Sequence, residues 1–104
     1  MLSVEPFRPA PNGTISISAV SSASVTGTLN ATIAQNIAVR IYNDGPSLAF
    51  VEFGGTVATL AITTTSMPVA VGAIEVVNID QCAYAAAITA SGTASVYFTK
   101  GYGL

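Results

Sequence analysis

Apolar residues of this chain alternate with polar ones over short runs, and each run ends at a group of turn-forming residues. At the start of one such run, Ile15, Ile17 and Ala19 alternate with threonine and serine. A period of two places successive side chains on opposite faces of a β-strand, so this run predicts a strand with one buried face. The pattern recurs along the chain and predicts an all-β fold.

We expect about seven or eight short antiparallel strands on this basis. They are predicted over Thr14 to Ala19, Ser24 to Leu29, Asn36 to Asn43, Leu48 to Phe53, Thr56 to Thr65 (strand or part loop), Ala73 to Ile79, Tyr84 to Ala90 and Thr93 to Thr99. Many short strands without helices form a sandwich or a small barrel, and a jelly-roll-like sandwich of two sheets is the fold expected first. The Ala-rich run from Cys82 to Ala90 offers a helical alternative, but its Ile88 and Thr89 favour a strand.

Two turns predict β-hairpins. Asp44-Gly45-Pro46 combines a glycine, which supplies a positive φ, with a proline, which cannot continue a ladder, so Asn36 to Phe53 is predicted as one hairpin. Ser91-Gly92 predicts the turn of a second hairpin between the last two strands. The alternation also predicts the buried side chains, which are Ile15, Ile17, Val39, Ile41, Val76, Val96 and Phe98.

The first thirteen residues differ from the rest because they contain Pro6, Pro9 and Pro11. Prolines lack the backbone donor and bias the preceding residue toward extended geometry. Residues 1–13 are therefore predicted as an extended arm and residues 14–104 as the sandwich domain. The arm is either a frayed end or a segment that lies on a neighbouring chain, with Phe7 as its apolar anchor. A signal peptide would have a basic start followed by an apolar run, whereas this segment has the acid Glu5 and three prolines, so no secretion is expected.

Charge is scarce in this sequence. Charged residues make up 8% of the 104 residues and the formal net charge is −2, whereas about 25% is typical of soluble domains. Isolated proteins usually depend on charge for solubility, so an assembled state is expected. Three Lys and Arg residues cannot neutralise several phosphates, which argues against nucleic acid as a partner. The uncharged run from Phe53 to Ile74 is too polar and too broken by glycine and proline to span a membrane as a helix.

Residues for catalysis or cofactor binding are also scarce. The chain has no histidine, which removes the usual general base and zinc ligand, and its single cysteine, Cys82, is expected to be a small buried hydrophobe. Glu52 and Glu75 are the nearest approach to an acid–base pair, but each is expected to face solvent or to meet Arg40 across a sheet. We therefore expect no enzyme activity, no cofactor and no metal.

Turn acids offer a calcium interpretation that we do not favour. Asp44 and Asp80 lie in turns beside Asn43 and Asn78, but their spacing fits no calcium-binding loop. Asx turns, in which the side chain bonds to the backbone two residues on, account for the same residues.

The candidate partner-binding residues are an aromatic, a cation and a proline of the arm together with two tyrosines expected to face outward. They are Phe7, Arg8, Pro9, Tyr42 and Tyr102. Surface tyrosines favour contact because they bring a large rigid area and one polar tip. Removal of residues 1–11 is expected to leave the sandwich folded while weakening assembly or partner binding, since the alternation starts only at Thr14.

Three segments carry a family resemblance: Val39 to Gly55, Ser66 to Ile79 and Ala90 to Leu104. In order, they contain an R-I-x-N strand before a glycine turn, an F-V-x-F-G strand end, a Met-Pro before a glycine bend, and a G-T-A-x-x-Y-x-T-x-G-x-G ending. In this order they resemble small β-rich virion proteins of tailed bacteriophages, encoded near head genes and taken to be capsid decoration or cement proteins. The match covers roughly the last two thirds of the chain and leaves out the Pro-rich start.

The resemblance implies a structural protein of the phage head, made in the host cytoplasm, whose partners are the major capsid protein or other virion subunits. Symmetric shells favour homo-oligomers, so a trimer or a dimer is expected. The alternative from another functional class is a fibre or host-attachment module that recognises a surface glycan or protein.

Overall fold

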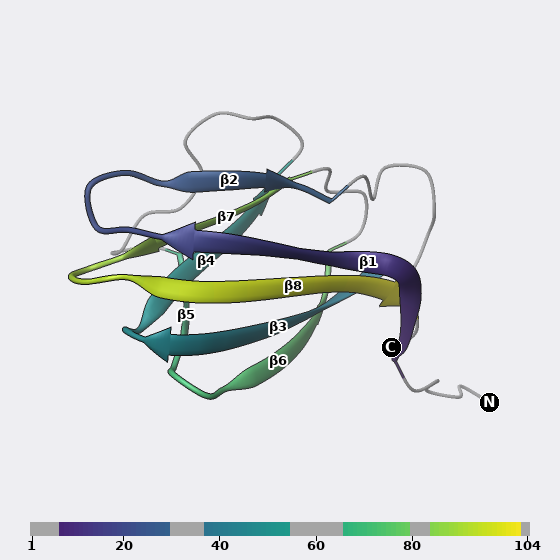
Figure 1. Ribbon diagram of the computed structural model, residues 1–104. Coiled ribbons are helices and arrows are strands. Elements are labelled where there is room, and N and C mark those ends of the chain that lie inside the picture. Colours follow the sequence, from purple (N-terminus) through teal and green to yellow (C-terminus); the bar gives the residue numbers. More distant parts are fainter. Residues whose placement is uncertain (1–6, 30–36, 55–65, 80–83, 103–104) are drawn as a thin grey trace.

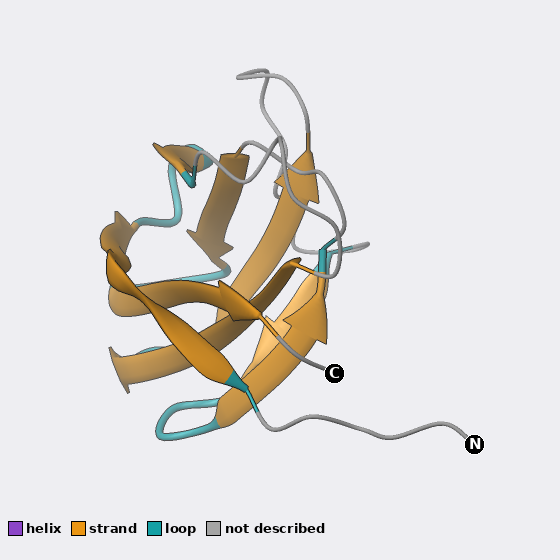
Figure 2. Ribbon diagram, turned by 90° about the vertical axis from the view of Figure 1, so that its right-hand side faces the viewer, coloured by secondary structure: helices purple, strands orange, loops and turns teal. Residues whose placement is uncertain are grey.

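The computed structural model describes residues 7–29, 37–54, 66–79 and 84–102, and these form two antiparallel sheets of four strands each. The strands are β1 (Arg8–Ala19), β2 (Val25–Thr28), β3 (Ile37–Pro46), β4 (Ala49–Gly54), β5 (Met67–Val69), β6 (Ile74–Asn78), β7 (Tyr84–Thr89) and β8 (Ala94–Tyr102). One sheet has the order β1-β8-β3-β6, and the other has the order β2-β7-β4-β5. We call them the front sheet and the back sheet, after their places in Figure 1; Figure 2 shows the sandwich after a quarter turn.

This strand order is that of a jelly roll, so the predicted fold class is confirmed. Successive strands cross from one sheet to the other, and among the described strands only β4 and β5 are sequence neighbours that pair. Most of the predicted strands are present with boundaries within a few residues. The Ala-rich run is a strand from Tyr84 onward, as expected, whereas Cys82 and the predicted strand from Thr56 to Thr65 lie outside the described residues.

Both predicted hairpins are wrong. β3 pairs with β6 and β8, whereas β4 pairs with β5 and β7. The Asp44-Gly45-Pro46 triplet lies within β3 at a register shift, and the two residues after it carry the chain to the other sheet. Likewise β7 and β8 lie in different sheets, although Gly92 between them does have the expected positive φ of 74°. Hairpins and inter-sheet connections need the same kind of turn residues. The choice between them depends on how the two sheets close around the core, which a local pattern does not contain.

Asn43 holds the inter-sheet connection after β3 in place. Its side chain is fully buried, and its Nδ2 donates to the carbonyl oxygens of Ser47 and Val69, each at 2.9 Å. Its Oδ1 accepts from the backbone N–H of Gly45 at 2.8 Å, which is the Asx turn expected in place of a calcium site. One side chain thus ties the end of β3 to the approach to β4 and to the end of β5.

The core lies between sheets whose inner faces differ in side-chain size. The largest fully buried side chains, Ile41 and Phe98, come from the front sheet, whereas the fully buried core residues of the back sheet are small: Ala49, Val51, Val69, Ala85 and Ala87. Large side chains of one layer fit against small ones of the other, which is how a close-packed interior is filled. The alanines of β7 thus give a central strand that lets the front sheet approach closely.

Most of the predicted core is confirmed. Five of the seven residues are buried, namely Ile17, Val39, Ile41, Val96 and Phe98, and Ile15 is half-buried and packs against them. Val76 was assigned to the wrong face. It pairs with Arg40 on the outer face, while its neighbour Val77 pairs with Val39 and packs against the core. Both faces of β6 carry apolar residues, so alternation could not distinguish them.

β1 begins at Arg8, so the expected boundary between residues 13 and 14 falls inside a strand. Arg8 pairs with Tyr102 and Pro9 with Gly101, before a register shift that lasts until Thr14. The shift includes Asn12, which has a φ of 55°. Prolines are tolerated here because β1 is an edge strand and the ladder is interrupted where they occur.

Candidate interaction surfaces

Four of the five predicted partner-binding residues meet at one end of the front sheet. Arg8 and Pro9 start β1 beside the end of β8, where Tyr102 lies, and the ring of Phe7 lies over Gly101. We call Phe7, Arg8, Pro9, Gly101 and Tyr102 the terminal cluster. Figure 1 shows the start of β1 bending across the end of β8 at this place. The fifth residue, Tyr42, lies elsewhere, on the outer face of the same sheet.

Gly101 lets the two chain ends approach each other. It is buried, and a Cβ atom added to it would collide with the carbonyl oxygen of Arg8 and lie 2.8 Å from Cζ of Phe7. Phe7 is half-buried, whereas Arg8 and Pro9 are exposed and Tyr102 is 42% exposed. Phe7 therefore packs within its own chain, and the cation, the proline ring and the tyrosine remain accessible to a partner.

The outer face of the front sheet carries a second group of contact residues, which we call the tyrosine face. It consists of Thr14, Arg40, Tyr42, Ile74, Tyr97 and Thr99, which line an open depression of about 350 Å³. The register aligns them in two rows across the sheet, because Tyr42 pairs with Tyr97 and Ile74, and Thr99 pairs with Thr14 and Arg40. The strands β8, β3 and β6 thus supply aromatic, cationic and aliphatic side chains, and β1 supplies hydroxyls.

The sequence did not predict that two large side chains of this face, Tyr97 and Ile74, would be exposed. Tyr97 is 38% exposed and Ile74 is 59% exposed. The signal for Tyr97 was present, because Val96 and Phe98 on either side of it face the core and a strand alternates. Ile74 had no such signal, since its position on the outer face follows from the register of β6 with Tyr42.

The hydroxyl of Tyr42 donates a hydrogen bond of 3.0 Å to Oδ1 of Asp44, and its ring stacks on Tyr97 with centroids 6.3 Å apart. The hydrogen bond to Asp44, reinforced by the negative charge of that carboxylate, raises the pKa of Tyr42. The neutral phenol is therefore favoured in the folded state. Its contribution to stability is present below the ordinary tyrosine pKa of about 10 and is lost as the pH rises through the folded value.

We predict that Asp44→Asn lowers the pKa of Tyr42, because the substitution removes the negative charge that opposes ionisation. The tyrosinate absorbance of the protein, followed against pH, measures this effect. The chain has four tyrosines, so the difference between the parent and Tyr42→Phe assigns the signal of Tyr42. An unchanged titration of Tyr42 in Asp44→Asn would contradict the prediction.

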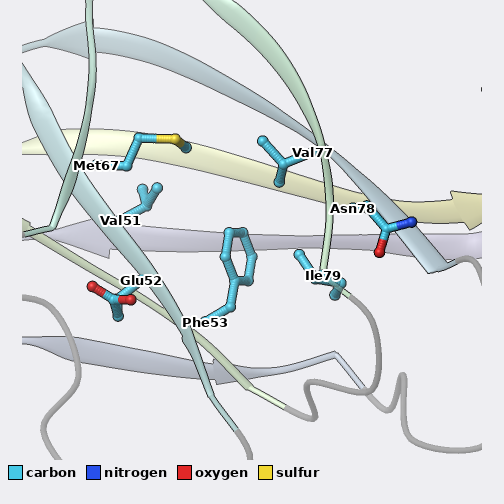
Figure 3. Close-up of a pocket in the computed structure, with 7 residues that line it drawn as sticks. All are labelled: Val51, Glu52, Phe53, Met67, Val77, Asn78 and Ile79. Atoms are coloured by element: carbon cyan, nitrogen blue, oxygen red, sulfur yellow. The ribbon is translucent and has the colours of Figure 1, made fainter. Parts of the chain in front are cut away.

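A third feature is a cleft of about 450 Å³ between the sheets, whose described lining comes from β4, β5, β6 and the residue after β6. Figure 3 shows Val51, Phe53, Met67 and Val77 gathered around it. Phe53 also makes an edge-to-face contact with the core residue Phe98 at 5.9 Å. This lining continues the hydrophobic core toward the surface.

The two acids considered as an acid–base pair lie on different sheets, Glu52 on β4 and Glu75 on β6. Glu52 accepts a 2.9 Å hydrogen bond from Oγ of Ser66, and Glu75 is exposed. Arg40 pairs across the front sheet with Val76 and Thr99, so the expected contact with a glutamate is not formed at its register position. In the part of the chain that the structure describes, no three metal-ligating side chains cluster together.

Comparison with known proteins gives no assignment: no protein-family model and no curated protein matches the chain. Within the described ranges, no helix is long and apolar enough to cross a membrane. The case for a function therefore comes from the fold and from the two surfaces above.

Proposed function

We propose that this chain is a structural virion protein of a tailed bacteriophage, which decorates or cements the capsid shell through repeated contacts with the major capsid protein or other virion subunits. In this role it is non-catalytic, is made in the host cytoplasm and resides in the phage head. The jelly roll supports the proposal, because viral capsid domains use this architecture. Lectin domains use it too, so the fold alone also fits the alternative of an attachment module.

The observation that carries the proposal is the terminal cluster. The Pro-rich start of the chain lies beside the end of β8, where Arg8 pairs with Tyr102 and Pro9 with Gly101, and Arg8, Pro9 and Tyr102 are all exposed there. Tyr and Arg are the residues that most often dominate protein–protein binding. Proline rings lose little conformational freedom when they dock, which favours binding.

The small number of charged residues supports the proposed role in shell binding independently. With only 8% charged residues, most of the surface can approach another protein without desolvating ions. A small protein repeated over a shell gains from this, because many weak contacts made at once add up to tight attachment.

We predict that Tyr102→Ser weakens binding to capsid shells by at least about tenfold, because truncating a central contact residue removes more than about 1 kcal/mol. Co-sedimentation with capsid shells assembled from a phage major capsid protein measures the affinity. Leu48→Ser is the matched control, since Leu48 is 43% exposed, nearly the same as Tyr102, but lies at the opposite end of the sandwich. Removal of residues 1–11 is expected to abolish shell binding while the strand pairs from Thr14 to Ala19 keep the sandwich folded.

The same assay separates the two functional classes. If the parent, Tyr102→Ser and Leu48→Ser bind shells equally well, the terminal cluster does not contact the shell. A parent protein that fails to bind shells but binds host-cell polysaccharide would overturn the proposal in favour of the attachment module.

A further inference from the structure

We infer that the tyrosine face is a self-association surface, on which two copies of the chain pack front sheet to front sheet around a two-fold axis. This inference rests on the proposed function for its setting, since a shell protein is expected to be oligomeric. It specifies the face, the symmetry and the charge pairing. The terminal cluster is at the end of the sheet and stays free to bind the shell.

The chemistry of the face suits a protein partner. Its centre is the stacked pair of Tyr42 and Tyr97, next to Ile74, which is 59% exposed. Tyrosine brings a large contact area with few rotatable bonds, and interfaces are enriched in it. The β1 side of the face is lined with small hydroxyl side chains, such as Thr14, whose Oγ1 bonds to that of Thr99 at 2.8 Å. These short side chains leave room for the rings of a second copy.

The charges of the face are complementary to themselves. Arg40 and Asp44 are both exposed and lie two residues before and two residues after Tyr42 on β3, each about 7 Å away along the strand. A two-fold axis that lies between the two front sheets, runs perpendicular to β3 and passes over Tyr42 reverses the strand direction in the second copy. Arg40 of each copy then lies opposite Asp44 of the other. Asp44 can accept this contact while it accepts from Tyr42, because a carboxylate has two oxygens.

Association through the sheet edges is disfavoured, which points to the face. The edge strand β2 of the back sheet has only four residues. The edge strand β6 of the front sheet carries the exposed charge of Glu75, and the edge strand β5 of the back sheet has three residues with Pro68 at its centre. Edge charges, prolines and short strands are the devices that prevent edge-to-edge pairing. The opposite edge begins with the prolines of β1 and its register shift.

The test is a charge swap measured by sedimentation equilibrium. We expect Arg40→Asp and Asp44→Arg each to weaken dimerisation by at least about a hundredfold, because both place like charges opposite each other at two symmetric positions. The double variant Arg40→Asp/Asp44→Arg restores complementarity within one face, and its dissociation constant is expected to return to within about tenfold of the parent. Circular dichroism checks that every variant keeps its β fold.

Glu75→Arg is the control, because it changes the net charge by the same amount as Asp44→Arg but lies at the register position of the core residue Ile41, whereas Asp44 bonds to Tyr42 of the tyrosine face. It is expected to dimerise like the parent. The inference is overturned if the parent is monomeric at all concentrations, if single charge reversals have no effect, or if the double variant associates no better than the single ones. A protein that is monomeric but binds shells would contradict the self-association and leave the proposed function intact. A protein that dimerises but does not bind shells would contradict the proposed function and leave the self-association intact.

Discussion

Replacing Asn43 with alanine is expected to lower the free energy of unfolding by about 3 to 5 kcal/mol, because three backbone groups, in two buried hydrogen bonds and one partly buried one, lose their partner at once. The N–H of Gly45 and the carbonyl oxygens of Ser47 and Val69 all depend on this side chain. An unsatisfied buried polar group costs about 1 to 3 kcal/mol. Urea unfolding followed by circular dichroism measures the loss.

The effect is large relative to the whole molecule. A domain of this size is stable by roughly 5 to 15 kcal/mol, so this one substitution removes a large share of the total. Asn43 also ties strands of both sheets together, since its backbone accepts from Gly72 and donates to Ala73, after β5. The variant is therefore expected to lose stability throughout the sandwich rather than only at the turn.

Two further substitutions show whether the hydrogen bonds are responsible. Leu48→Ala changes an exposed residue of the same connection between β3 and β4, and is expected to alter stability by less than about 0.5 kcal/mol. Asn43→Asp keeps the acceptor for Gly45 but replaces both donors with oxygen, so it is expected to be at least as unstable as Asn43→Ala near neutral pH. Its deficit is expected to shrink as the pH falls, because a protonated carboxyl can donate again. A loss below about 1 kcal/mol in Asn43→Ala would contradict this account.

The local pattern of the sequence was enough to predict the strands but not how they connect. Ile17, Val39 and Ile41 faced the core as their alternation required, because each lies on a strand with one polar face. Gly45 has the expected positive φ of 87°, but its triplet forms a bulge inside β3 instead of a turn between two strands. The partners of this segment across the sandwich, such as Val69, are distant in sequence, so the crossing between sheets could not be read from local residues.

The candidate surfaces could likewise be predicted in part from local residues and in part not. Tyr42 was predicted to face outward, and Tyr97 could have been predicted from its buried neighbours. Their assembly into one face with Arg40 and Ile74 depends on the register of three strands, which is a long-range property. The terminal cluster depends on the pairing of Arg8 with Tyr102, residues from opposite ends of the chain.

Gly101→Ala is expected to separate the start of β1 from β8 while the rest of the sandwich stays folded. The new Cβ would occupy the space of the Arg8 carbonyl oxygen and crowd the ring of Phe7. Because the obstacle is backbone, a side-chain rotation cannot relieve it and the strand must move. The pairs from Thr14 to Ala19 lie beyond the register shift and are expected to persist.

Limited proteolysis measures this separation at the Phe7–Arg8 bond, which a protease that cleaves after aromatic residues can cut. Cleavage of a segment that opens transiently follows the population of the open form, and overpacking of this kind costs about 1 to 3 kcal/mol. We therefore expect cleavage after Phe7 to accelerate at least about fivefold in Gly101→Ala. Gly72→Ala is the matched control: its φ of 81° strains an alanine, but nothing lies within 4 Å of the added Cβ.

Gly72→Ala is expected to lose about 1 kcal/mol of stability with no change in the rate of cleavage after Phe7. Equal cleavage of Gly101→Ala and the parent would mean that the chain ends do not depend on their close approach. If the terminal cluster binds the shell as proposed, Gly101→Ala also weakens shell binding by at least about tenfold while leaving the dimer intact, since the tyrosine face lies farther along the sheet. Loss of both activities together would instead indicate that the substitution disturbs the whole front sheet.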